Sequence, residues 1–247
     1  WRSVAVSPDG SKAVAVDAGG YVYTSPDSGA TWVEQTTSGQ KDWQDVAMSS
    51  DGLKIVAKDD NTGSGGYIYT SLDGGTTWTE QITIGAKIWK GVSVSDNGNK
   101  IFVVEDGFGS GGYIHTSLDS GVTWGAQFGA TLPATSWKGI ACSDDCSFIV
   151  VTEDGTGGGG YVYTSSDSGL TWVRRFSAGQ KFWGKVTTSG DGLHVATYEA
   201  NGSIYMSSDS GTTWTEQVAT GTRDWKGIAS SQDGTFLAAV ASGQNVF

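Results

Sequence analysis

The sequence is poor in several residues on which enzymes and helical proteins depend. Among its 247 residues there are three prolines, two cysteines, two methionines and two histidines. A zinc site or a serine triad could use only His115 and His194, and both stand at positions where the repeat described below varies. Helix-favouring runs of Ala, Leu, Glu and Lys are missing too, which excludes a helical fold.

Positive charge and long apolar runs are also scarce. The chain has 15 Lys and Arg residues but 26 Asp and Glu residues, which gives a formal net charge of −11. No basic stripe is present to displace counterions, so nucleic acid is excluded as a partner. The longest apolar runs, such as Phe236 to Ala241, are far too short for a bilayer core of roughly 30 Å, and we expect no membrane insertion.

Glycine and tryptophan, by contrast, are abundant, with 38 and 11 copies, and they mark a repeat. The phrase W-x-x-V/I-x-x-S occurs six times, and the phrase S-x-D-x-G-x-T-W occurs five times. Every tryptophan belongs to one phrase or the other. The first phrase recurs every 42 to 48 residues, starting at Trp1, Trp43, Trp89, Trp137, Trp183 and Trp225.

Each repeat contains four short runs typical of β-strands. In the third unit they read WKGVSVS, KIFVVE, GYIHTS and TWGAQ, separated by turn residues. Four short strands at this period suit the blade of a β-propeller, in which small sheets stack face to face. The sequence therefore predicts an all-β fold, a β-propeller of four-stranded antiparallel blades forming one domain over residues 1–247.

The second phrase resembles the Asp-box of sialidases, sortilin-type receptors, photosystem assembly factors of the Asp-box type and several glycoside hydrolases. The resemblance implies that these motifs lie at the blade periphery, away from the active mouth. We expect each Asp to accept backbone N–H bonds in the turn between the third and fourth strands, and each Trp to pack over the hairpin. Metal or glycan binding by these carboxylates is the alternative. The residues are Asp27, Asp73, Asp119, Asp167 and Asp209, with Trp32, Trp78, Trp124, Trp172 and Trp214.

The number of first phrases predicts six blades. The last unit stops early, and its end, residues 243–247, matches residues 19–23 at the start of a third strand. A sixth blade would then lack its outermost strand, which a segment preceding Trp1 could supply. Five blades with the sixth copy as an overlapping latch is the alternative.

The resemblance also raises a sialidase-like glycoside hydrolase as an enzymatic alternative. Such enzymes share a clamp of three arginines and an Arg-Ile-Pro phrase. This chain has only Arg2, Arg174, Arg175 and Arg223, and no Arg-Ile-Pro. We therefore expect that the protein is not an enzyme.

A set of charged residues in register is the candidate ligand site. An acid ends the second strand of each complete unit, and lysines lie near the start of the first strand. Both positions open on one face of a propeller, so they predict a mouth that binds a glycan or a protein, or a calcium ion held by several oxygens. The alternative is a solvated surface of weak ion pairs. The residues are Asp17, Asp59, Glu105, Glu153 and Glu199, with Lys90, Lys138 and Lys226.

The two cysteines, Cys142 and Cys146, flank the turn between a first and a second strand. A disulfide across this hairpin is expected, with two unpaired thiols as the alternative. The acidic, lysine-poor composition favours an extracellular or cell-surface location, and the chain begins at Trp1 without methionine, which favours a processed or truncated chain.

These features favour a non-catalytic extracellular module that binds a glycan or a protein. A structural subunit of a cell-surface or extracellular assembly and a glycoside hydrolase are the alternatives. No cofactor is expected apart from the calcium ion considered above. Ligand identity and oligomeric state are left open by the sequence.

Overall fold

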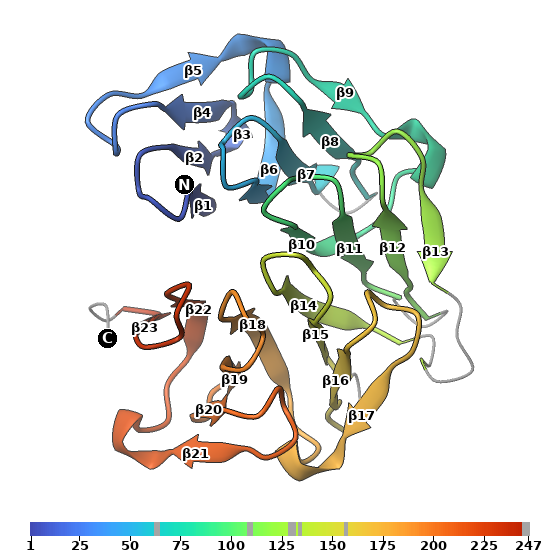
Figure 1. Cartoon of the computed structure of the whole chain (residues 1–247), viewed down its shortest axis with the longest axis vertical. Helices are drawn as coiled ribbons and strands as arrows, with labels where there is room; N and C mark the ends of the chain where they lie inside the picture. The colour runs from blue at the N-terminus through green and yellow to red at the C-terminus, as the bar shows by residue number, and fades with distance from the viewer. Residues whose placement is uncertain (62–64, 108–110, 128–131, 133–134, 156–157, 244–247) are drawn as a thin grey trace. The chain divides into compact units, whose positions relative to one another are not determined.

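The computed structural model describes residues 1–61, 65–107, 111–127, 132, 135–155 and 158–243. Six antiparallel sheets follow one another along this part of the chain (Figure 1). The chain packs as two compact units, the first formed by residues 1–105 and 114–126, the second by residues 106–113 and the chain from Gln127 onward. Each unit holds three consecutive sheets.

Sheets 1 to 3 belong to the first unit. Sheet 1 has the strand order β1-β2-β4-β5, sheet 2 the order β6-β7-β8-β9 with β3 added beside β6, and sheet 3 the order β10-β11-β12-β13. Their bounds are β1 Ser3–Val6, β2 Ala13–Val16, β3 Ala18–Gly20, β4 Val22–Ser25, β5 Val33–Gln35, β6 Lys41–Met48, β7 Ile55–Asp59, β8 Ile68–Ser71, β9 Thr79–Glu80, β10 Trp89–Val94, β11 Ile101–Glu105, β12 Ile114–Ser117 and β13 Gly125–Gln127.

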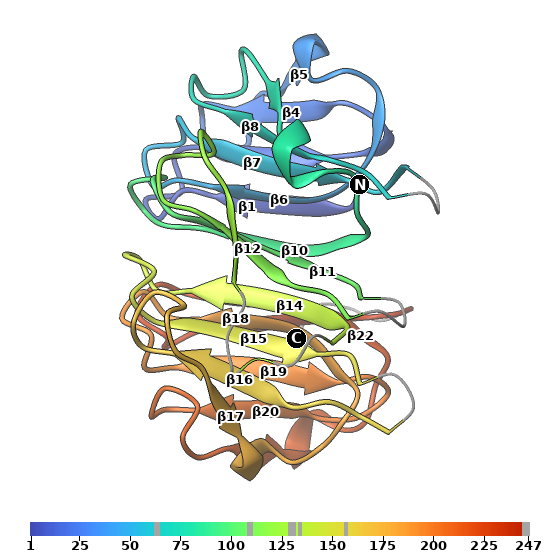
Figure 2. The same ribbon diagram turned by 90° about the vertical axis from the view of Figure 1, so that its right-hand side faces the viewer.

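Sheets 4 to 6 belong to the second unit. Sheets 4 and 5 are four-stranded, and Figure 2 shows β14 to β17 of sheet 4 in chain order, whereas sheet 6 has two strands among the described residues. Their bounds are β14 Trp137–Cys142, β15 Ile149–Glu153, β16 Val162–Ser165, β17 Val173–Arg175, β18 Trp183–Thr188, β19 Val195–Glu199, β20 Ile204–Ser207, β21 Thr215–Gln217, β22 Trp225–Ser230 and β23 Leu237–Ala241.

Short 3₁₀ turns follow four of the fourth strands: η1 Thr36–Ser38, η3 Ile82–Ile84, η4 Phe176–Ala178 and η5 Val218–Thr220. Throughout the described ranges, no helix reaches the length and apolar character that crossing a membrane requires.

The core consists of the contacts between consecutive sheets. The second strand of sheet 2, β7 (IVAKD), is buried along its whole length because sheets 1 and 3 cover its two faces. In the first unit, Trp43 of sheet 2 packs in one cluster with Val14, Val16 and Val22 of sheet 1. In the second unit, Trp183 of sheet 5 packs in the same way with Val150 of sheet 4. Trp43 and Trp183, at the same position of their repeats, therefore each fill the space between two sheets of one unit.

The prediction of four-stranded antiparallel blades is confirmed for five sheets, and the sixth copy forms its own two-stranded sheet. Six sheets among the described residues agree with the prediction of six blades. The third strand expected at residues 243–247 lies almost wholly outside the described residues. A single domain over the whole chain stays a prediction.

Candidate functional site

Each sheet has two ends of different chemistry. The tryptophan end is where the first strand starts and the second strand ends, and the Asp-box end carries the turns between first and second and between third and fourth strands. In sheet 3, Trp89 lies opposite Glu105 at the tryptophan end. The predicted acids and lysines all lie at this end of their sheets.

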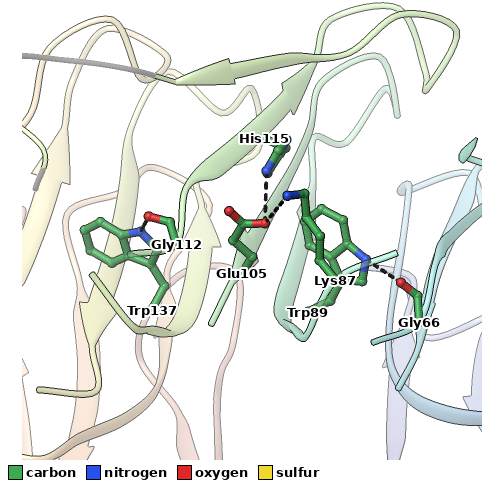
Figure 3. A network of polar contacts seen from close by, with 7 residues as sticks. All are labelled: Gly66, Lys87, Trp89, Glu105, Gly112, His115 and Trp137. Atoms are coloured by element: carbon green, nitrogen blue, oxygen red, sulfur yellow. Dashed lines mark hydrogen bonds and ion pairs between the residues drawn. The ribbon is translucent and has the colours of Figure 1, made fainter. Parts of the chain in front are cut away.

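Glu105 is at the centre of a buried polar network in the first unit (Figure 3). Its Oε2 atom lies 2.8 Å from Lys87 Nζ and 3.4 Å from His115 Nε2. His115 in turn packs edge-on against Trp89, with ring centroids 5.1 Å apart. Burial of the carboxyl opposes its ionisation, but His115 and Lys87 outweigh that effect and hold the pKa of Glu105 below its usual value.

Asp59 has the equivalent position in sheet 2 but forms no such ion pair with any described residue. Its Oδ1 accepts the backbone N–H of Tyr67 at 2.6 Å, and burial raises the pKa of this carboxyl. Lys41, which corresponds to Lys87, lies instead over the ring of Tyr69, 4.7 Å from its centroid. Asp17 of sheet 1 is more exposed, with Oδ1 3.5 Å from the N-terminal amine.

The second unit repeats these arrangements. Glu153 accepts the Thr135 hydroxyl at 2.5 Å through Oε1 and the Tyr161 N–H at 3.0 Å through Oε2. Glu199 pairs with Lys181 at 3.3 Å. A hydrogen bond to Tyr205 and the pair with Glu199 raise the pKa of Lys181. Thus the predicted acids bind donors of their own sheet or loop.

The three predicted lysines are also engaged. Lys138 Nζ lies 3.2 Å from Asp154 Oδ2, and Lys226 Nζ lies 2.8 Å from Asp224 Oδ1. Lys90 has an interaction partner as well. The Lys138–Asp154 and Lys226–Asp224 pairs are partly or largely exposed, so they present both charges to solvent on the second unit.

Glycines that precede the third strands complete this end. Gly66 pairs with Lys87, and Gly160 pairs with Lys181, as isolated antiparallel bridges between consecutive sheets. A Cβ on Gly66 would lie 1.7 Å from Asp59 Oδ1, and one on Gly160 would lie 2.5 Å from Glu153 Cγ. The Gly-Gly pair before the third strand was the available signal, since its second glycine leaves room for the acid.

Tryptophans strengthen the same junctions. Trp89 Nε1 donates to the Gly66 carbonyl at 3.0 Å, and Trp137 Nε1 donates to the Gly112 carbonyl at 3.1 Å (Figure 3). Trp225 bonds to Gly202 at 3.0 Å. The tryptophan end is consequently an architectural junction as well as a candidate binding surface.

The Asp-box end has the local bonding predicted from the motif. In sheet 4, Asp167 accepts the Thr171 N–H at 2.8 Å, the Thr171 hydroxyl at 2.5 Å and the Ser165 hydroxyl at 2.7 Å. The Trp172 indole donates to Gly169 at 3.0 Å. Bonds of this kind recur in all five motifs and lower the pKa of every Asp-box carboxyl, to about 2 in Asp209.

Within the described residues, no group of three or more His, Cys, Asp or Glu side chains is arranged to hold a metal ion. In the structure Cys142 and Cys146 form a disulfide across the turn between β14 and β15, with Cα atoms 4.9 Å apart.

Comparison with known proteins finds likeness in structure and not in sequence. No protein-family model matches the chain, and no curated protein matches it. A solved structure of YCF48 bound to D1 peptide matches 98% of this chain and 74% of that chain, at 15% identity and a TM-score of 0.68. YCF48 from Cyanidioschyzon merolae gives 16% identity, 99% and 80% coverage, and a TM-score of 0.67.

The chain is a β-propeller. A GH74 xyloglucanase from Xanthomonas campestris is similar to it as well, at 14% identity and a TM-score of 0.65, over 99% of this chain but 43% of the enzyme. The TM-scores show that this propeller shares its fold with a protein solved with a peptide and with part of a hydrolase.

Proposed function

We propose that this propeller is a non-catalytic module that binds an extended protein segment at the tryptophan end of its sheets. The observation that carries the proposal is the engagement of the acids there. Glu105 is buried against Lys87 and His115, and Glu153 is bonded by Thr135 and Tyr161. Hydrolysis of a glycoside needs one carboxyl that donates a proton and a second that attacks or activates water, whereas these carboxylates have structural partners.

Exposed charge pairs at the same end supply the binding groups. Lys138 with Asp154 and Lys226 with Asp224 offer donors and acceptors to a peptide backbone and its side chains. YCF48, a propeller of similar fold, has been solved with a D1 peptide, which supports a protein ligand over a glycan. The disulfide supports an extracellular or cell-surface location, because such bonds persist in oxidising compartments.

A peptide array and a glycan array, each with and without calcium, test the proposal. We expect extended peptides to be retained, and the double variant Lys138→Ala/Lys226→Ala to bind about tenfold or more weakly, as loss of one charged contact predicts. The matched control is Lys12→Ala/Lys54→Ala, which removes two lysines at the Asp-box end. Equal losses in both double variants, or retention of glycans alone, would contradict a peptide site at the tryptophan end.

A glycoside hydrolase remains the second candidate because the GH74 xyloglucanase shares the fold. Release of reducing ends from xyloglucan, abolished in Glu153→Gln, would favour it. No release is expected.

A further inference from the structure

The turn between β19 and β20 departs from the repeat at two positions. In the other four-stranded units, two glycines and a tyrosine lead into the third strand. Sheet 5 has Asn201 in place of the first glycine and Ser203 in place of the tyrosine, and it keeps the second glycine as Gly202. These two departures together form the sequence Asn-x-Ser, the acceptor motif for N-linked glycans. The corresponding residues elsewhere are Gly19, Gly65, Gly111 and Gly159, with Tyr21, Tyr67, Tyr113 and Tyr161.

The backbone of the turn explains the first two residues of the motif. The four corresponding glycines have φ between 79° and 84°, and Asn201 has a φ of 57°, in the same left-handed region. Asparagine is one of the few residues besides glycine that adopt this region readily. A Cβ on Gly202 would lie 2.7 Å from Glu199 Cγ, so this position requires glycine. The turn therefore accounts for Asn201 and Gly202, but it does not require a serine next.

Asn201 is exposed at the tip of this hairpin. The Gly202 N–H donates to the Glu199 carbonyl at 2.9 Å, and the Glu199 N–H donates to the Ser203 carbonyl at 3.0 Å, which closes the turn beneath it. Within the described ranges, no side-chain hydrogen bond or ion pair engages Asn201. Sheets 4 and 6, which flank sheet 5, belong to the same compact unit. The side-chain amide of Asn201 is thus open to solvent on this unit.

Asn97 provides the contrast within the same chain. It also precedes a glycine in an exposed turn, but the residue after that glycine is Asn99, so the motif is incomplete. Its Oδ1 accepts the Ser95 hydroxyl and the Asn99 N–H, each at 2.9 Å. Asn97 therefore uses its side chain within its own turn and lacks the hydroxyl residue that the motif needs.

We propose that Asn201 is the attachment site of an N-linked glycan. Transfer forms a bond between Asn201 Nδ2 and C1 of the sugar, and it breaks the bond between C1 and the pyrophosphate of a lipid-linked oligosaccharide donor. The amide loses one proton, and the lipid pyrophosphate is the leaving group. The reaction is one of secreted proteins, so it requires the extracellular or cell-surface location proposed above.

Peptide mass spectrometry of protein recovered from its native source tests the site. Trypsin releases residues 186–223 as one peptide, in which Asn201 is the sole asparagine. An N-glycosidase in water enriched in oxygen-18 should remove the glycan and leave an aspartate with one heavy oxygen atom at position 201. Spontaneous deamidation is measured by a sample without the enzyme and by Asn97, which also precedes a glycine.

Two variants that restore the repeat separate the motif from the turn. Asn201→Gly and Ser203→Tyr each introduce the residue that the other sheets have, so folding should be retained while the motif is lost. When the wild type is secreted from a eukaryotic host, N-glycosidase should shift its band on a denaturing gel. Both variants should run with the deglycosylated wild type, whereas the matched control Asn97→Gln should keep the glycan.

Three results would overturn the proposal. An unmodified Asn201 in the native peptide 186–223 would exclude the glycan. Secretion of the wild type without a glycan would show that this turn is not an acceptor. A band shift that persists in Asn201→Gly or in Ser203→Tyr would place the glycan outside this motif.

Discussion

The two ends of the sheets use the same residue types in different ways. At the Asp-box end, Asp167 is bonded by Ser165 and Thr171, all within seven residues of chain. At the tryptophan end, Glu105 is paired with Lys87 and lies 3.4 Å from His115, residues that come from strands and loops up to 18 residues away. The first end is stabilised locally, while the second depends on the packing of whole sheets.

This difference explains why a carboxylate that recurs at one position of the repeat is weak evidence for a binding site. The Asp-box carboxylates are exposed or half-buried and have lowered pKa values, because donors in their own turn favour the charged form. At the tryptophan end, burial raises the pKa of Asp59 but ion pairs lower that of Glu105. Equivalent positions of the repeat therefore have opposite electrostatics.

The largest loss of stability should come from removing the Trp89 side chain at the tryptophan end. Trp89 is fully buried, bonds to Gly66 and packs against His115. Trp89→Ala should lower the free energy of unfolding by about 3–5 kcal/mol, as expected for a large-to-small change in a core. Urea denaturation measures the loss.

Trp1→Ala is the matched control for this change. Trp1 has the same position in sheet 1 but is 75% exposed. Replacing Trp1 by Ala should lower the free energy of unfolding by less than about 1 kcal/mol. Equal losses at the two positions would mean that Trp1 is buried in solution.

A smaller effect is expected from Glu105→Gln, which removes the charge but keeps the shape. Loss of the charged contacts to Lys87 and His115 should cost about 1–3 kcal/mol at pH 7. Because the folded-state pKa is lowered, this stabilisation is present above the unfolded pKa of about 4.3 and is lost as pH falls through the folded pKa. The difference between wild type and variant should shrink accordingly when urea denaturation is repeated in acid.

Asp59→Asn provides the contrast of opposite sign. Burial raises the pKa of Asp59, so its ionisation costs stability above that pKa, and the cost disappears below the unfolded value. Asparagine can still accept the Tyr67 N–H through Oδ1. Asp59→Asn should therefore be neutral or stabilising at pH 7, and a loss as large as that of Glu105→Gln would refute this electrostatic difference.

The repeat in the sequence was enough to predict the strands, the turns and the hydrogen bonds within each turn. It was not enough to predict which side chains are buried by contacts between strands and sheets. The phrases around Trp89 and Asp167 identified strands, turns and the local bonding of each Asp-box, because these depend on neighbours within a few residues. They could not predict that Glu105 is buried against His115, since this contact requires the register of β11 with β12. The exposure of Trp1 could not be predicted either, because the sequence phrase that it begins has the same pattern as the phrase that begins at Trp43.

The next prediction concerns the Asp-box end and the hydrogen bonds of Asp167. Asp167→Ala removes an acceptor used by Thr171 and Ser165, and should cost about 1–2 kcal/mol, similar to loss of a helix N-cap. Asp167→Asn keeps the Oδ1 acceptor for the Thr171 N–H and should lose less than half as much. Thermal unfolding of the wild type and the two variants measures the loss of stability in each. Equal losses in the two variants would show that the negative charge matters more than the local hydrogen bonds.

The smallest effect should come from the disulfide, which reinforces one turn at the Asp-box end. Cys146 has a φ of 48°, in the left-handed region, where the equivalent residue of every other sheet is a glycine with φ between 67° and 75°. A cysteine costs about 1 kcal/mol in this conformation relative to glycine, whereas closing so short a loop contributes about 2 kcal/mol.

The backbone cost offsets about half of the loop-closure contribution, so Cys142→Ser/Cys146→Gly should lose only about 1 kcal/mol. Cys142→Ser/Cys146→Ser keeps the strained conformation without the bridge and should lose about 2 kcal/mol. Urea denaturation of the two double variants separates the contributions. Equal stability of the Cys146→Gly and Cys146→Ser double variants would mean that the backbone conformation at residue 146 costs no stability. The disulfide would then act only by restricting the unfolded chain.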